Sequence, residues 1–460
     1  MRLTALPTAA LALLSTIASP AATSLVDSIP ALQAALDAAV PGDTITVKDG
    51  VYTTTQAITV RCPGTAEMPV TIAAQTVGGV EIAGTNGFDL VEPAAYTVVS
   101  GFKLTHASGH NSIGADTSHV RFTRNTFLCA GDLPYLTVTG DDAQVDHNDF
   151  GEKKTGNMIS VTGSGSQIAR RLWIHHNYFH DFADASANGN EMIRYGLLSA
   201  HGLSTGAGLV EYNLFARCHG VTESISNRSS GNTYRFNTFV DGANSRLELR
   251  AGNECQVYGN YFRDTEGMRI FGDRHLIFSN YFEGNYVAIS LGNGDGELAD
   301  GGPTSVHDRP DGCVIVFNTF VDNRTHYKMN KRSSKALGAT NTTFSNNVLQ
   351  GGEIAAKIDG PYPGAIWSNN LLWNVPDTAN MPDSAFIKAD PLLVADAAGT
   401  RRPQAGSPAL GAALGSFPAV SVDLDGQPRP EKKSIGADEP DSAPATAKFL
   451  TPDDVGPAAK

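Results

Sequence analysis

The sequence predicts an all-β fold, a right-handed parallel β-helix in which short strands stack coil upon coil. Three observations support this. An Asn-x-(aromatic or aliphatic) motif recurs along most of the chain, short β-prone segments alternate with turns rich in Gly, Asn and Asp, and the chain contains 47 glycines. The motif begins at Asn125, Asn148, Asn177, Asn213, Asn237, Asn260, Asn280, Asn318, Asn347 and Asn370.

The spacing of this motif sets the length of one coil. The intervals between successive asparagines are 23, 29, 36, 24, 23, 20, 38, 29 and 23 residues. The shortest intervals agree on one coil, and the longer ones contain an inserted loop. A leucine-rich repeat fold does not fit, because the leucine spacing of such repeats is absent from this sequence. A propeller does not fit either, because it needs about forty residues per blade. We expect the asparagines to adopt left-handed turns and to bond along the axis, with the aromatic two places on pointing inward.

The N-terminus has the three-part form of a secretory signal. Arg2 precedes an apolar run over residues 5–14, and small residues follow at Ser19, Ala21 and Ala22. This run is too short to span a bilayer, so residues 1–23 are expected to be a signal peptide and the protein to be secreted and extracellular. A buried N-terminal helix is the alternative.

A helix is expected directly after the signal. Ser28 is a suitable N-cap, Pro30 lies in the first turn, and Leu32 and Leu36 fall on one face. Strands are expected over 44–48 and 51–54. A single short helix before many strands suits a cap that covers the open end of the solenoid. The β-helix domain is expected over 24–440, closed by the segments 407–411 and 423–439, with a disordered tail over 441–460.

Charge and cysteine content exclude several functions. The net charge of −13 argues against nucleic acid as a partner. No later segment is apolar enough for a membrane span, so no membrane partner is expected. The protein is expected to be a monomer. The five cysteines are widely spaced, without a CxxC pair, which argues against a zinc site but still allows one or two disulfides.

The N-glycosylation sequence pattern occurs at Asn227, Asn323 and Asn341, so the protein is a candidate glycoprotein.

Ionisable residues gather between Asn177 and Gly284. Arg228, Arg250 and Arg269 are 22 and 19 residues apart, close to one coil each, which predicts neighbouring coils and one face. A solvated ladder of charges is the structural interpretation. Three adjacent arginines repel one another, however, unless carboxylates or an anionic ligand lie among them. Glu223, Glu248 and Asp273 are the candidate carboxylates.

Oxygen ligands in the same stretch could gather a Ca²⁺ ion. Glu191 and Glu223, with Asn188 or Asn190, have the required chemistry. His275 follows Gly-Asp-Arg and is interpreted either as a turn histidine with satisfied hydrogen bonds or as a substrate contact.

Four segments carry a resemblance to a known family. NGNEMIRYG (188–196), GVTESISNRSS (220–230), RLELRAGNECQVYGNYF (246–262) and GMRIFGDRH with NYFEG (267–284) resemble polysaccharide lyase family six. That family includes alginate lyases and the dermatan-cleaving chondroitinase B. The resemblance covers roughly residues 27–440.

The resemblance implies a role for several positions. The catalytic base falls on Arg228, in Asn-Arg-Ser-Ser where the family has Lys, and the acid falls on Arg250, followed by Ala251 where the family has His. One calcium glutamate falls on Glu223, but the other falls on Val221. The metal set is therefore expected to be Asn188, Glu191 and Glu223, and the substrate contacts to be Lys154, Arg194, Tyr195, Arg269 and His275.

The implied chemistry is β-elimination at a uronic acid. The sugar carboxylate is neutralised, a base removes the C5 proton, and an acid protonates the departing O4. Tyr195 or Tyr234 is an alternative base. The expected function is a secreted lyase of an anionic uronate polysaccharide, alginate before dermatan sulfate. A binding or inactive homologue is one alternative. A polygalacturonase-type hydrolase is another, but it needs an Asp cluster that the sequence lacks.

Overall fold

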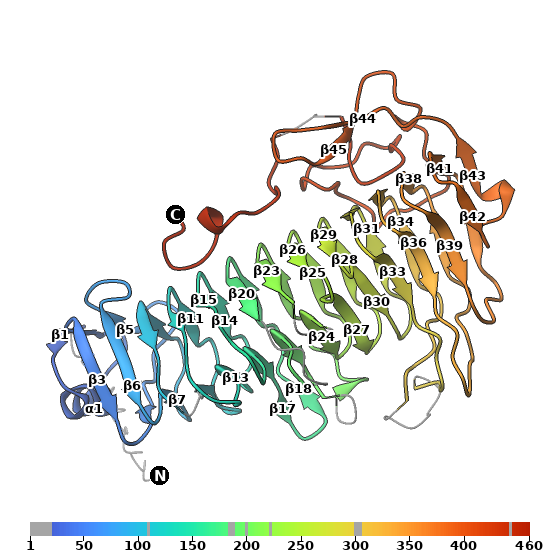
Figure 1. The fold of residues 1–460 in the computed structure, drawn as a ribbon. Helices are drawn as coiled ribbons and strands as arrows, with labels where there is room; N and C mark the ends of the chain where they lie inside the picture. Colours follow the sequence, from blue (N-terminus) through green and yellow to red (C-terminus); the bar gives the residue numbers. More distant parts are fainter. Residues whose placement is uncertain are drawn as a thin grey trace, which may run out of the picture.

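Three long parallel sheets wind around one hydrophobic core, as the sequence predicted (Figure 1). The computed structural model describes residues 21–107, 111–182, 189–197, 201–219, 223–298, 306–440 and 444–460. Most of the expected signal peptide lies outside the described residues. From β2 onward each coil visits the first, second and third sheet in turn, so a strand of the coils pairs with its counterparts in the coils before and after it.

The first sheet stacks one strand from each coil. It comprises β1 (Thr23–Val26), β2 (Thr44–Val47), β5 (Val70–Ala74), β8 (Thr97–Ser100), β11 (Arg121–Thr123), β14 (Gln144–Asp146), β19 (Trp173–His175), β22 (Leu209–Glu211), β25 (Thr233–Arg235), β28 (Gln256–Tyr258), β31 (Leu276–Phe278), β34 (Val314–Val316), β37 (Thr343–Ser345) and β40 (Ile366–Ser368).

The second sheet follows the first in each coil. It comprises β3 (Gly50–Thr54), β6 (Val80–Gly84), β9 (Phe102–Leu104), β12 (Thr126–Phe127), β15 (Asp149–Phe150), β20 (Tyr178–Phe182), β23 (Leu214–Cys218), β26 (Thr238–Gly242), β29 (Tyr261–Thr265), β32 (Tyr281–Glu283), β35 (Thr319–Val321), β38 (Val348–Gln350), β41 (Asn370–Trp373) and β43 (Phe386–Lys388).

The third sheet completes each coil. It comprises β4 (Ile58–Val60), β7 (Phe88–Leu90), β10 (Ser112–Ile113), β13 (Leu136–Val138), β16 (Ile159–Val161), β21 (Ile193–Tyr195), β24 (Ile225–Arg228), β27 (Leu247–Ala251), β30 (Met268–Ile270), β33 (Val287–Leu291), β36 (Thr325–Met329), β39 (Ile354–Ile358) and β42 (Asp377–Ala379).

Several short elements lie at the ends of the coils or in the connections between their strands. Helix α1 (Ile29–Ala38) covers the N-terminal end with Leu32 and Leu36 buried, and the Ser28 side chain accepts a hydrogen bond from the Ala31 backbone N–H, as predicted. Two antiparallel hairpins and two 3₁₀ turns add to the strands. They are β17 (Gly163–Ser164) with β18 (Gln167–Ile168), β44 (Leu393–Ala395) with β45 (Arg401–Pro403), and the turns Asp383–Ala385 and Pro452–Asp454.

The recurring asparagines form one continuous buried ladder, which confirms the predicted bonding along the axis. Each side-chain Nδ2 donates to the Oδ1 of the next asparagine at 2.9–3.1 Å, from Asn125 through to Asn370. The predicted left-handed conformation is displaced by one residue. It belongs to the residue before the asparagine, such as Arg124, His147 or Phe236, so that the asparagine side chain points inward and reaches backbone groups.

The aromatic residues of the motif stack inside the second sheet, as expected. Ring centroids of successive phenylalanines lie 4.5–5.0 Å apart from Phe127 to Phe320. This spacing matches the distance of about 4.8 Å between neighbouring strands. Stacked rings and amides therefore set the coil register together.

The C-terminal segment was predicted incorrectly. The coils end with β43, and residues 389–440 and 444–460 run back along the outside of the solenoid (Figure 1). Residues 444–460, expected to be disordered, are ordered against earlier coils. Leu450 packs on Leu214 and donates its backbone N–H to Thr238 Oγ1, and the Arg124 guanidinium donates to the Pro457 carbonyl oxygen at 2.6 Å.

Two other features bear on the sequence expectations. All five cysteines are buried and free, so none forms a disulfide. Asn227 and Asn323 are fully buried and hydrogen-bonded, so neither can carry a glycan, whereas Asn341 is exposed. Within the described ranges, the structure has no helix that is long and apolar enough to cross a membrane.

Candidate functional site

Arginines gather on the outer face of the third sheet. Arg228, Arg250 and Arg269 lie on β24, β27 and β30, which are successive strands of that sheet, so the prediction from their spacing is confirmed. Arg269 pairs in register with Glu248. The register shifts between Asn227 and Arg228, and Arg228 pairs with Ala251. Arg250 is therefore the extra residue of a bulge, a feature that re-aims side chains next to functional sites.

Arg228 is held by two buried carboxylates. Its Nη2 lies 3.0 Å from Glu191 Oε1 and 3.9 Å from Glu223 Oε2, and its Nε donates to Ser226 Oγ at 3.1 Å. The second oxygen of Glu191 accepts a hydrogen bond from Asn157 Nδ2 at 2.5 Å. The Arg228 side chain remains 20% exposed, so it is fixed in direction and still open to a ligand.

Glu248 lies at the base of the cluster. Its side chain is fully buried, with carboxylate oxygens 2.9 Å from Arg246, 3.7 Å from Arg250 and 3.9 Å from Arg269. Burial acts to raise the pKa of Glu248, but the surrounding arginines outweigh it and lower the pKa. The Arg250 and Arg269 guanidinium groups also lie over the Phe271 ring, at 6.0 and 4.6 Å. One buried anion thus holds three cations in place.

The Glu223 carboxyl titrates near neutrality. Burial, together with the negative charge of Glu248, raises the pKa of Glu223 to about 7. Its Oε2 atom is buried without a hydrogen-bond partner. Glu223 therefore supplies only part of the charge that would balance Arg228 at neutral pH.

Two predicted substrate contacts are wrong, because both side chains are in the interior. Tyr195 is fully buried and points into the core, where burial raises its pKa. The His275 ring is fully buried, accepts a hydrogen bond from the Cys255 backbone N–H, and contacts the Phe271 carbonyl oxygen at 2.8 Å. Burial lowers the pKa of His275 to about 4. Tyr234, the alternative base, is also buried and donates to Asn227.

The other predicted residues reach different positions. Arg194 lies on β21 in register with Ser226 and donates to Ser160 Oγ at 3.1 Å, so it borders the cluster, and burial lowers its pKa. Lys154 is exposed in the connection between β15 and β16. Asn188 and Val221 lie outside the described residues.

The described carboxylates do not fit a calcium ion. Ca²⁺ takes six to eight oxygen ligands. Both oxygens of Glu191 are already engaged by Arg228 and Asn157, which leaves one buried Glu223 oxygen without a hydrogen-bond partner. The Arg228 guanidinium also contacts both glutamates, where a cation would otherwise balance them. No step of the reaction is therefore assigned to a metal.

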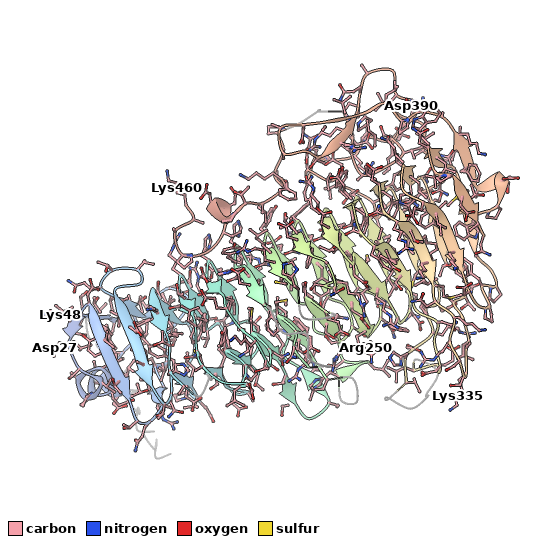
Figure 2. The ribbon with its side chains drawn as sticks, in the orientation of Figure 1. Asp27, Lys48, Arg250, Lys335, Asp390 and Lys460 are labelled. Carbon is pink, nitrogen blue, oxygen red and sulfur yellow. The ribbon has the colours of Figure 1, made fainter. Side chains whose placement is uncertain are left out.

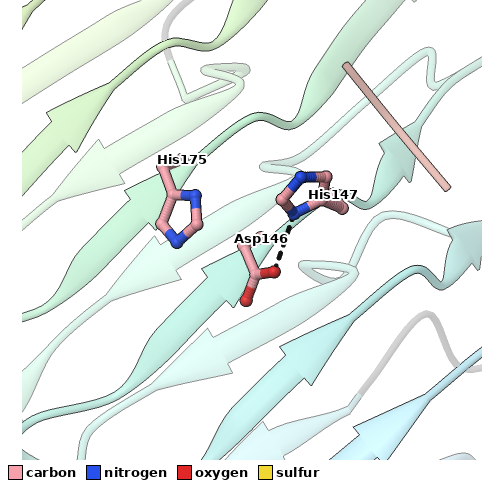
Figure 3. A group of neighbouring side chains, drawn as sticks. All are labelled: Asp146, His147 and His175. Atoms are coloured by element: carbon pink, nitrogen blue, oxygen red, sulfur yellow. Dashed lines mark hydrogen bonds and ion pairs between the residues drawn. The ribbon is translucent and has the colours of Figure 1, made fainter. Parts of the chain in front are cut away.

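A second group of possible metal ligands is structural. Ligand atoms of Asp146, His147 and His175 lie within 4.8 Å of one another on the first sheet (Figure 3). Hydrogen bonds from Arg121, His147 and Thr123 engage the Asp146 carboxylate and, against the effect of burial, hold its pKa far below its usual range. Burial lowers the pKa of His175 to about 4. Asp146 is therefore already engaged by its neighbours, and the His175 ring nitrogens contact Gln144 and His176.

A polar pocket beside Arg269 was not predicted. It is lined by Arg269, Ser290, Asn293, Asn330, Lys331 and Arg332. Figure 2 places Arg250 on the side of the solenoid away from the C-terminal segment, and Lys335 of the adjoining loop near the same edge. The basic run 331–335 was the available signal, but its long sequence separation from Arg269 concealed the contact.

Comparisons with known proteins place this fold and site in context. The sequence model of the family described as Chondroitinase B matches residues 26–382. No curated protein is similar enough in sequence to count as a relative. Among solved structures, the alginate lyase AlyGC, described as a member of family PL6, superposes with a TM-score of 0.74 at 24% identity, over 84% of this chain and 55% of that one.

Two further structures cover more of their own length. A mannuronic acid-specific family 6 lyase from human gut microbiota has a TM-score of 0.65 at 22% identity, over 76% of this chain and 86% of its own. The PL6 polysaccharide lyase Pedsa3628 from Pseudopedobacter saltans has a TM-score of 0.63 at 20% identity, over 80% and 97%. These structures share the fold, and this chain spans little more than half of AlyGC.

Proposed function

Because the chain belongs to the chondroitinase B family, we propose that it is a polysaccharide lyase that cleaves an anionic uronate polysaccharide, with alginate as the first candidate, by β-elimination. The observation that carries this proposal is the set of three guanidinium groups on one face of the third sheet. The buried Glu248 holds Arg250 and Arg269, and Glu191 holds Arg228. Such a cluster suits a substrate whose every sugar unit carries a carboxylate. The structures of alginate lyases with the same fold support alginate as the first substrate to test.

The elimination requires charge neutralisation, proton abstraction and protonation of the leaving group, and the site offers a side chain for each. Arg269 and Arg250 neutralise the sugar carboxylate, which makes the C5 proton acidic enough to remove. Arg228 takes that proton, the bond between C4 and O4 breaks, and a double bond forms between C4 and C5. Arg250 donates a proton to the departing O4, so the products are a new chain end and an unsaturated uronate.

Arg228 must be neutral before it can accept a proton. An arginine side chain normally keeps its proton even at alkaline pH. Glu191 is the described group placed to receive that proton, because its Oε1 lies 3.0 Å from Nη2. Because an arginine base is rarely neutral near pH 7, turnover by this route is expected to be slow there and to increase with pH.

The activity test is release of unsaturated uronate from alginate, followed by ultraviolet absorbance. Arg228→Ala and Arg250→Ala should each reduce kcat by at least about 100-fold, the range for loss of a general acid or base. Arg235→Ala is the matched control, since Arg235 pairs with a buried glutamate on the first sheet. Equal activity of wild type and both cluster variants would rule out these roles.

Binding without turnover is the second candidate function. The engagement of Arg228 by Glu191 favours it, because a guanidinium paired in this way binds an anion more readily than it removes a proton. Retained affinity for alginate without any absorbance change, on alginate and on dermatan sulfate, would establish binding as the function.

We also propose that the protein is secreted, which can be tested by its appearance outside the producing cells.

A further inference from the structure

A row of cations continues from the arginine cluster toward the C-terminal coils. Arg269 on β30 is in register with Ser290 on β33, Ser290 with Lys328 on β36, and Lys328 with Lys357 on β39. All four occupy the same outward position of the third sheet. Two more cations thus lie on the line that begins at the proposed reaction site.

In the opposite direction the row of cations ends at Arg194. Arg194 is in register with Ser160, and the same position then holds Thr137, Ser112 and Asp89 toward the N-terminal coils. The Ser112 hydroxyl donates a hydrogen bond to Asp89 on the neighbouring coil. Beyond the cluster and Arg194 this row is therefore asymmetric, with cations on the C-terminal side and neutral or acidic groups on the N-terminal side.

The two lysines are available to a ligand. None of the ion pairs formed by the described residues includes Lys328 or Lys357, and Lys357 is exposed. Two arginines at this end are already paired, since Arg332 contacts Asp295 and Arg324 contacts Glu353. The exposed Asp359, two residues after Lys357, is the nearest acidic group along the chain.

The spacing of these groups fits a polyuronate. Neighbouring parallel strands are about 4.8 Å apart, which is close to the advance of one unit in a 1,4-linked sugar chain. A polymer lying along the solenoid axis therefore presents about one carboxylate to each coil. The polar pocket beside Arg269, with Asn293, Asn330 and Arg332, borders this path.

We propose that the polymer lies along the third sheet with its longer bound part over β33, β36 and β39, where Lys328 and Lys357 bind carboxylates two and three sugar units from the one held by Arg269. This inference rests on the proposed function. It assigns extended subsites on one side of the reaction site only.

The test compares short and long oligouronates on one double variant. Lys328→Ala with Lys357→Ala should raise KM for a hexamer about fivefold, as expected for two half-exposed ion pairs, with the trimer KM affected less. The loss should shrink at high salt because such contacts are screened. Lys48→Ala with Lys432→Ala is the control, since both lysines are exposed and lie off the third sheet.

Direct binding separates failure of this inference from failure of the proposed function. Calorimetric titration with the hexamer should show the same loss of affinity in the Lys328 and Lys357 variant, whether or not the protein turns the hexamer over. Identical hexamer affinity and KM in wild type and variant would overturn the extended subsites and leave the lyase proposal intact. Absence of turnover with a weakened hexamer affinity would support the subsites and overturn the lyase proposal.

Discussion

Replacing the buried carboxylate of Glu248 should damage stability and turnover together. Glu248→Gln removes the negative charge that three guanidinium groups share at 2.9, 3.7 and 3.9 Å. Removing one partner of a buried ion pair typically costs about 3–5 kcal/mol. Arg250 and Arg269 are 23% and 31% exposed and can relax toward water, and glutamine still accepts one hydrogen bond, so we expect the lower end, about 3 kcal/mol.

The pH dependence of this loss has a definite sign. The folded-state pKa of Glu248 is lowered, so its charge stabilises the fold above the unfolded-state pKa of about 4.3 and that stabilisation is lost as pH falls through the folded value. Wild type and variant should therefore differ most at neutral pH and converge in acid. Urea unfolding at several pH values measures this.

A matched control separates stability from catalysis. Glu211→Gln removes an equally buried carboxylate on the first sheet, which accepts from Arg235 at 2.6 Å and from Trp173 at 2.8 Å. Both variants should lose stability, but only Glu248→Gln should lower kcat, by about tenfold or more, because misplaced catalytic groups are costly. Full stability and full kcat in Glu248→Gln would refute the reasoning. Lost stability with normal kcat would make Glu248 purely structural.

Four further outcomes follow from the same structure. The rate of the wild type should increase with pH up to at least about pH 9, because Arg228 must lose a proton; a bell-shaped profile centred near pH 7 would contradict this. Chelator-treated wild type should keep its activity on alginate within about twofold of the untreated protein, since Arg228 occupies the place of a cation. Activity that is lost with the chelator and restored by calcium would contradict this expectation. Glu223→Gln should stabilise the protein above pH 7, where charging the raised-pKa carboxyl weakens the fold, and the gain should vanish at pH 4, as measured by urea unfolding. Asn237→Ala should cost about 3 kcal/mol or more, because Val210 O and the Asn213 side chain and backbone N–H groups lose their buried partner; an unfolding midpoint equal to that of wild type would show that water replaces the amide.

The placement of three arginines on one face was predicted correctly because coil length is nearly constant in this stretch. Arg228, Arg250 and Arg269 follow one another at intervals close to one coil, so spacing alone placed them on one face. Tyr195 and His275 were placed on that face incorrectly. Tyr195 is adjacent to the outward Arg194, and a shift of one residue in a strand reverses the side on which a side chain lies. His275 lies in a turn, where alternation does not apply.

Periodic local chemistry in the sequence determined the solenoid itself, since each asparagine satisfies backbone groups of the neighbouring coil wherever the motif recurs. Tertiary structure alone decided what depends on loops of unequal length. Lys328 comes into line with Arg269 across one intervening coil although 59 residues separate them, and Leu450 packs on Leu214 from the far end of the chain. Such contacts depend on how inserted loops close and which surfaces remain to be covered, and the repeat spacing does not encode either.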